Sequence, residues 1–111
     1  MKTILNLLIV SILSGLFACN SEESKVQIPK NVLPIAKMER YLYDLHELEA
    51  KLQTSGIRQD TLSQLFPVLE KDLMKKHKTD TGMVKRSFRF YAKNIAMMDT
   101  IYTHLLKKAE K

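Results

Sequence analysis

The chain has 111 residues, a formal net charge of +6 and a single cysteine, Cys19. This length is enough for one domain and too short for two. One cysteine excludes an internal disulfide, which small exported proteins often use to reinforce a limited core.

The first 18 residues have the pattern of an export signal. Lys2 supplies a positive charge, and the apolar run 4–17 is shorter than the roughly 20 residues that span a bilayer. The tetrapeptide Leu16-Phe17-Ala18-Cys19 resembles a lipobox, in which a small residue precedes the cut and a thiol accepts the lipid. We predict a lipoprotein signal peptide over 1–18 and lipidation of Cys19. An ordinary secreted protein or an uncleaved anchor is the alternative.

Residues 19–34 are expected to form the lipid anchor and a flexible linker. The segment is polar, contains Pro29 and Pro34, and has no sustained periodicity. Asn20 stands where an aspartate retains many lipoproteins at an inner membrane, which favours the outer membrane. The run Ser21-Glu22-Glu23 resembles the acidic export tags of Bacteroidota surface lipoproteins, with a plain solvated linker as the alternative. The domain is expected to face either the periplasm or the surface.

The remainder, residues 35–111, is predicted to be an all-α bundle of about four helices. Apolar residues recur at three- and four-residue steps, which is the spacing of one helical face. No alternating strand pattern appears. The expected helices cover 35–52, 61–77, 81–93 and 95–108.

The expected helix ends follow from turn and capping residues. Gly56 is a natural left-handed terminator for the first helix. The second helix is expected to be capped by Asp60 or Thr61, the third by Asp80 and the fourth by Asn94. Within the second helix, Pro67 lacks an N–H and clashes with the preceding turn, so we expect a kink or a break near Phe66.

The ionisable residues of the first helix do not form a recognisable catalytic motif. His46-Glu47 begins like a zinc-protease motif, but Ala50 stands where the second histidine is required. We expect His46 to bond to a nearby carboxylate or to the backbone. Asp44, Glu47 and Glu49 fit a solvated helix face better than acid–base catalysis. The sequence therefore predicts no enzyme, no metal site and no cofactor.

The stretch from Lys71 to Lys93 is strongly basic, with eight basic and two acidic residues. Its centre interleaves cations with aromatic residues, as some nucleic-acid binders do. We expect no nucleic-acid partner, because an exported domain meets little nucleic acid; anionic lipid, lipopolysaccharide or an acidic protein face fits better. The alternative is a solvated rim with Phe88 and Tyr91 in the core.

Several short motifs resemble those of a family of small Bacteroidota lipoproteins that carries domain of unknown function 4296. The resemblance runs from Pro34 to Lys108 and rests on Asp44-Leu45-His46 with Glu49-Ala50, Lys76-His77, Ser87 with Phe90-Tyr91, and Ile101-Tyr102 with Leu105. Lys78 and Ile95 depart from it, since the family usually has glycine and proline there. The resemblance implies a helical fold and an envelope location, and no activity.

Two functions are compatible with these patterns. The first is a non-enzymatic lipoprotein, anchored at the outer membrane, that binds another envelope protein. The alternative is a structural module whose basic rim binds anionic lipid or lipopolysaccharide. The candidate binding residues are Asp44, His46, Lys85, Arg86, Arg89 and Tyr91.

Overall fold

The computed structural model describes residues 25–111, and this part of the chain contains four helices and no strand. The helices are α2 (Ile35–Gln53), α3 (Gln59–Lys76), α4 (Thr81–Lys93) and α5 (Ile95–Ala109). The all-α prediction is confirmed. The predicted signal peptide over 1–18 and the lipidation site Cys19 lie outside the described residues.

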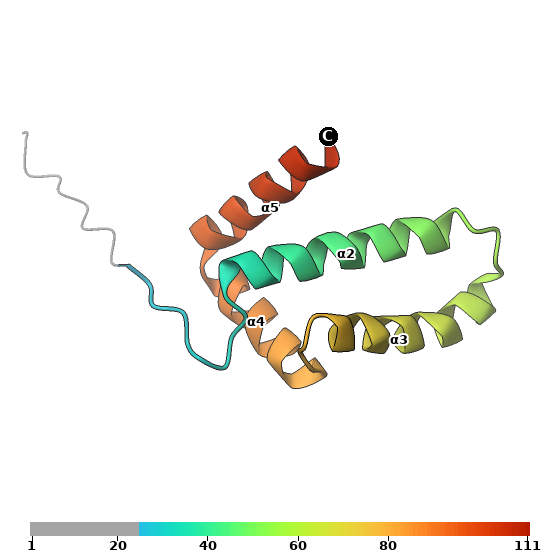
Figure 1. Ribbon diagram of the computed structural model, residues 1–111, viewed down its shortest axis with the longest axis horizontal. Helices are drawn as coiled ribbons and strands as arrows, with labels where there is room; N and C mark the ends of the chain where they lie inside the picture. Colours follow the sequence, from blue (N-terminus) through green and yellow to red (C-terminus); the bar gives the residue numbers. More distant parts are fainter. Residues whose placement is uncertain (1–24) are drawn as a thin grey trace, which may run out of the picture.

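Helices α2 and α3 form an antiparallel hairpin, and α2 lies between α3 and α5 (Figure 1). Helix α4 lies at the end of the hairpin where α2 begins and α3 ends. Helix α5 turns back from α4 and packs along α2. We call the region where α2, α4 and α5 meet the base, and the half of the hairpin beyond it the tip, which comprises residues 47–66.

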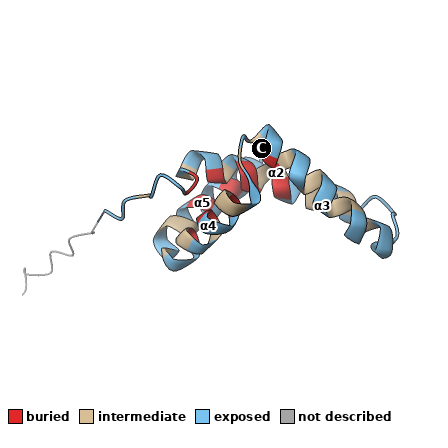
Figure 2. Ribbon diagram, turned by 90° about the horizontal axis from the view of Figure 1, so that it is seen from below, coloured by how far each residue is buried: buried red, intermediate tan, exposed pale blue. Residues whose placement is uncertain are grey.

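The core lies in the base (Figure 2). Met38, Tyr41 and Leu42 of α2 are fully buried, and Tyr91 of α4 and Ile101 of α5 pack in the same cluster. The spacing of the α2 residues puts them on one face, as the sequence pattern predicts. The base therefore contains most of the hydrophobic stabilisation of the domain.

The tip is much more thinly packed than the base. Only Met74, near the end of α3 at the base, is buried in that helix. Within the tip, Leu62, Leu65 and Phe66 of its apolar stripe are only partly covered, and Phe66 packs against the edge of the core cluster. Leu69 and Leu73, nearer the base, are partly covered as well. Figure 2 shows exposed and half-exposed ribbon along the whole outer end of the hairpin.

Residues 28–34 form a strap that packs on the base, which corrects the expected extent of the flexible linker. Val32 and Leu33 are buried in the core cluster. The Leu33 N–H donates to Ser87 Oγ at 2.8 Å, and the Tyr91 hydroxyl donates to the Leu33 carbonyl at 2.7 Å. Both polar backbone groups of a buried residue are thus satisfied by α4 side chains. Residues 28–34 therefore belong to the packed domain and not to a flexible linker.

The observed helix ends confirm some predicted caps and correct others. Gly56 has a positive φ of 72°, and Asp80 accepts a hydrogen bond from the Met83 N–H at 2.8 Å. Helix α3 begins earlier than expected, at Gln59, so neither Asp60 nor Thr61 is its cap. Asp60 instead lies in the first turn, where a carboxylate suits the positive end of the helix dipole.

The side chain of Asn94 bonds to the helix that precedes it, α4. Its side-chain amide donates to the Phe90 carbonyl at 2.6 Å, and it makes no side-chain cap bond to α5. The amide satisfies one of the unpaired carbonyls at the end of α4. Asn94 is nevertheless the N-cap residue of α5, as predicted, and its carbonyl accepts backbone bonds from the Met97 and Met98 N–H groups at 3.0 and 3.1 Å. Only the expected side-chain cap is missing, because the side chain bonds to α4 instead.

Helix α3 runs through Pro67 as one helix, so the expected break does not occur. It ends in a Schellman turn, with Lys78 N–H bonded to the Lys75 carbonyl at 3.0 Å and Thr79 N–H to the Met74 carbonyl at 2.9 Å. Lys78 occupies the left-handed position of that turn, with a φ of 52°. Glycine adopts this conformation at lower cost than any other residue.

Candidate functional site

A groove runs between the two helices of the tip. It has a volume of about 380 Å³ and is lined from α2 by Glu49, Leu52 and Gln53 and from α3 by Gln59, Leu62, Ser63, Phe66 and Pro67. Leu52, Leu62 and Phe66 are all half-buried. Apolar surface of this kind at helical spacing can receive a further helix.

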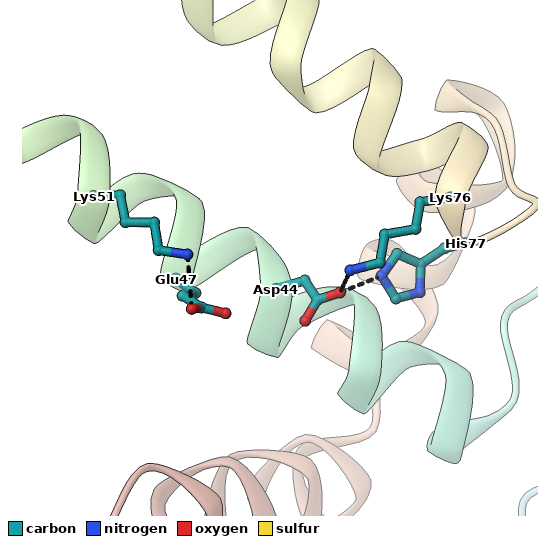
Figure 3. A network of polar contacts seen from close by, with 5 residues as sticks. All are labelled: Asp44, Glu47, Lys51, Lys76 and His77. Atoms are coloured by element: carbon teal, nitrogen blue, oxygen red, sulfur yellow. Dashed lines mark hydrogen bonds and ion pairs between the residues drawn. The ribbon is translucent and has the colours of Figure 1, made fainter.

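A polar network ties α2 to α3 between the base and the groove (Figure 3). Lys76 Nζ and His77 Nε2 both lie 2.9 Å from Asp44 Oδ2. Partial burial pushes the pKa of Asp44 up, but the hydrogen bonds and charges of Lys76 and His77 outweigh it and hold the pKa below its usual value. The hydrogen bond to Asp44 also raises the pKa of Lys76. Asp44 therefore links α2 to the end of α3.

Tyr41 extends this contact into the core. Its ring packs edge-on against His77, with 5.7 Å between ring centroids. Its hydroxyl lies 3.5 Å from Glu70 Oε1. Burial, followed by the nearby charge of Glu70, raises the pKa of Tyr41 to about 12, so the phenol stays protonated at neutral pH.

His46 lies on the other side of α2, towards α5. Its Nδ1 is 3.1 Å from Glu49 Oε2, which confirms the expected bond to a nearby carboxylate. Its ring lies 6.3 Å from that of Tyr102. The structure therefore does not bring His46 and Asp44 into one site, although both are on α2.

Helix α5 is held on α2 by polar as well as apolar contacts. His104 Nδ1 lies 2.6 Å from Glu39 Oε1, and Lys108 Nζ is 4.0 Å from the centre of the Tyr43 ring. Beside these contacts, a second groove of about 410 Å³ is lined by Tyr43, His46, Glu47, Tyr102, Leu105, Leu106 and Ala109.

The basic residues of α4 divide into two roles. Lys85, Arg89 and Lys93 are exposed, and none forms an ion pair within residues 25–111. Arg86 Nε donates to the Asn31 carbonyl at 3.1 Å, so Arg86 holds the strap. Arg86 is exposed as well, but the other three make no polar contact with the described residues, and we call Lys85, Arg89 and Lys93 the rim.

Tyr91 is fully buried, and its hydroxyl bonds to the strap. Its candidacy as a binding residue is therefore corrected, because it has no surface to offer a partner. Burial, followed by the charge of Glu39, raises the pKa of Tyr91. Ser87 beside it was not a sequence candidate, although its spacing of four residues from Tyr91 puts both side chains on one helix face.

Across residues 25–111, no helix has both the length and the apolar content needed to cross a bilayer. The same range has no group of three His, Cys, Asp or Glu side chains that could hold a metal ion. Asp44 and His77 do share a bond, but their neighbour Lys76 carries an ammonium group, which donates hydrogen bonds and offers no lone pair.

The fold and these contacts define a small all-α domain in which a helical hairpin extends from a packed base. The family described as "Domain of unknown function (DUF4296)" matches residues 29–111, and the chain belongs to this family. The match begins at the strap and includes the four helices of the described residues. No curated protein and no solved structure matches the chain.

Proposed function

We propose that the protein is a non-enzymatic lipoprotein of the cell envelope, anchored through Cys19 at the outer membrane, whose domain binds another envelope protein. The anchor is supported by the apolar run 4–17 and by the lipobox pattern that ends at Cys19. The resemblance of the helix motifs to small Bacteroidota lipoproteins supports the same placement.

One observation carries the binding role, namely the incomplete cover of the tip. Helix α3 has 18 residues, and only Met74 is buried. A helix whose only role is to pack in its own bundle normally buries a continuous apolar stripe. The stripe of α3 is half-exposed, and Val68 next to it is 58% exposed. Apolar surface that a domain leaves open in this way is typical of an interaction site.

The occupant that fits best is an amphipathic helix of the partner protein. The groove lies between two antiparallel helices, and α5 packs on α2 rather than α3. A third helix laid along the tip would cover both apolar stripes, as in three-helix packing. Glu49 and Gln59 at the groove's edge provide polar partners for the rim of such an interface.

Photocrosslinking in the lipidated, full-length protein tests this proposal. A photoreactive residue replaces Leu62 or Phe66 in the groove, or Ile95, which is 79% exposed on α5, as the control. We expect both groove positions to capture one protein that the control position does not. That protein, once purified, should bind Leu62→Gln at least about tenfold more weakly than wild type, since a buried leucine contributes roughly 1.5–3 kcal/mol.

The control for that binding measurement is Ile95→Gln, which should bind as wild type does. Equal capture from Ile95, or unchanged binding by Leu62→Gln, would contradict the proposal.

A second function, binding of anionic lipid or lipopolysaccharide through the rim, is favoured by the exposure of Lys85, Arg89 and Lys93, which form no ion pair within residues 25–111. Because Arg86 holds the strap, the suitable test variant carries Lys85→Gln, Arg89→Gln and Lys93→Gln. If the rim is the binding surface, this variant should lose most of its affinity for lipopolysaccharide, and wild-type binding should fall steeply with salt. Equal binding by both proteins would rule the rim out.

A further inference from the structure

A hollow lined by three lysines lies where the strap meets α2 and the α3–α4 turn. It has a volume of about 380 Å³. Lys30 comes from the strap, Lys37 from the start of α2 and Lys78 from the turn, so three separate segments bring one lysine each. Val32, Leu33 and Met83 contribute apolar surface to the same hollow.

The charge of this hollow is not balanced by the domain. No acidic residue lines it, and none of the three lysines forms an ion pair within the described part of the chain. All three lysines are exposed, and together they give this end of the domain a locally positive potential. Such a potential attracts anions.

The backbone of Lys78 is an independent sign that its side chain matters. Its φ of 52° is a left-handed conformation that is unfavourable for lysine and costs glycine almost nothing. The turn around it is a complete Schellman motif, for which glycine is the usual residue. Strain of this kind is concentrated at functional positions.

We propose that the hollow binds the phosphate of an anionic phospholipid headgroup. The three ammonium groups provide charge-assisted donors for phosphate oxygens, and the apolar residues fit the adjoining glycerol and acyl carbons. The strap, which begins at residue 28, lines the hollow, so the site lies where the chain leaves the domain towards its N-terminal segment (Figure 1). The inference that the phosphate belongs to a membrane lipid rests on the proposed lipid anchor. The inference that the hollow binds a phosphate does not depend on that anchor.

Lysine footprinting of the full chain in nonionic detergent tests the site. The probe is dihexanoylphosphatidylglycerol, with dihexanoylphosphatidylcholine and inorganic phosphate at equal concentration as comparisons. At a phosphatidylglycerol concentration about four times its Kd, we expect amine labelling of Lys30, Lys37 and Lys78 to slow by about fivefold, because the unprotected fraction falls as 1/(1 + L/Kd), where L is the free lipid concentration. Lys107 and Lys111 should label unchanged. Equal slowing at all five lysines, or none, overturns the proposal, and equal protection by inorganic phosphate overturns the lipid source.

A pair of charge-matched variants separates the hollow from general electrostatics. One carries Lys30→Gln, Lys37→Gln and Lys78→Gln; the other is the rim variant, which loses the same three charges. We expect the hollow variant to bind phosphatidylglycerol about 100-fold more weakly, and the rim variant within about fivefold of wild type. Equal losses in the two variants overturn the site. Because the probe is soluble, this result is independent of the anchor and of any protein partner.

Discussion

The base and the tip share helix α2, yet they are packed very differently. In the base, Leu42 is fully buried among residues from α4, α5 and the strap. In the tip, Leu65 has the same side chain on the same kind of apolar stripe and remains partly exposed. An apolar stripe therefore predicts which face of a helix is suited to burial. It does not predict whether another segment of the same chain buries that face.

The difference separates stability from recognition. Local opening of a protein costs least where few apolar contacts and buried hydrogen bonds must be broken. The tip has few of either, whereas the base combines core residues with the strap bonds at Leu33. The base can keep the domain folded while the tip stays free to adapt to a partner helix.

The largest expected contrast compares one truncation at each end. Leu42→Ala removes a fully buried side chain and should lower the free energy of unfolding by about 3 kcal/mol. Leu65→Ala removes a partly exposed one and should cost about 1 kcal/mol or less. Urea denaturation of the two variants measures both values. Equal losses would mean that the tip is packed as firmly as the base.

The next effect concerns the strap. Ser87→Ala leaves the buried Leu33 N–H without its acceptor, so the variant should lose about 1.5 kcal/mol of stability. Hydrogen exchange at the Leu33 amide should accelerate by a corresponding factor. Ser63→Ala on the exposed surface of α3 is the control, with an expected change within about 0.5 kcal/mol. A Leu33 amide that stays protected would contradict the role of Ser87.

A smaller effect is expected at the polar network in which Asp44 of α2 bonds to Lys76 and His77. Asp44→Asn should cost about 1 kcal/mol at neutral pH. Because the folded-state pKa of Asp44 is lowered, its stabilisation is present above its unfolded pKa near 4 and is lost as pH falls through the lower folded value. The difference between wild type and variant should therefore disappear at pH values well below about 4.

The matched control is Glu47→Gln, whose partner Lys51 lies 2.9 Å away on the same helix (Figure 3). This exposed pair should contribute about 0.5 kcal/mol at most. A difference for Asp44→Asn that persists unchanged into acid would show that its charge is not the cause.

The smallest expected effect is a gain. Lys78→Gly relieves the left-handed conformation at the end of α3 and should stabilise the domain by somewhat less than about 1 kcal/mol, because glycine also adds freedom to the unfolded chain. Lys78→Ala removes the same cation without relieving the backbone and should not stabilise. Thermal unfolding of the pair distinguishes the two. An equal gain from alanine would place the cost in the lysine charge.

The helices could be predicted from sequence because their information is local. The apolar steps of α2, α4 and α5 are uninterrupted, and the predicted starts at residues 35, 81 and 95 agree with the structure. The capping role of Asp80 could also be predicted from the sequence, because its bond joins residues three positions apart. Asn94 was harder, because it stands between two helices and can serve either.

The contacts that define the sites could not be predicted from the sequence, because they join residues that are far apart along the chain. Val32 and Leu33 are an isolated apolar pair between two prolines, too short to show a period, and their partner Ser87 is 54 residues away from Leu33. Asp44 and His77 are 33 residues apart. The three lysines of the hollow come from different segments, and only the fold brings them together.

Residue-by-residue hydrogen exchange of the full-length protein tests the contrast between base and tip most directly. The amides of 38–42 and 84–91 report on the base, and those of 48–52 and 60–66 report on the tip. We expect protection in the tip to be at least about 100-fold lower, which corresponds to roughly 2.7 kcal/mol less local stability. Equal protection in the two regions would contradict the account, because the tip would then be a completed part of the core with no need of a partner helix.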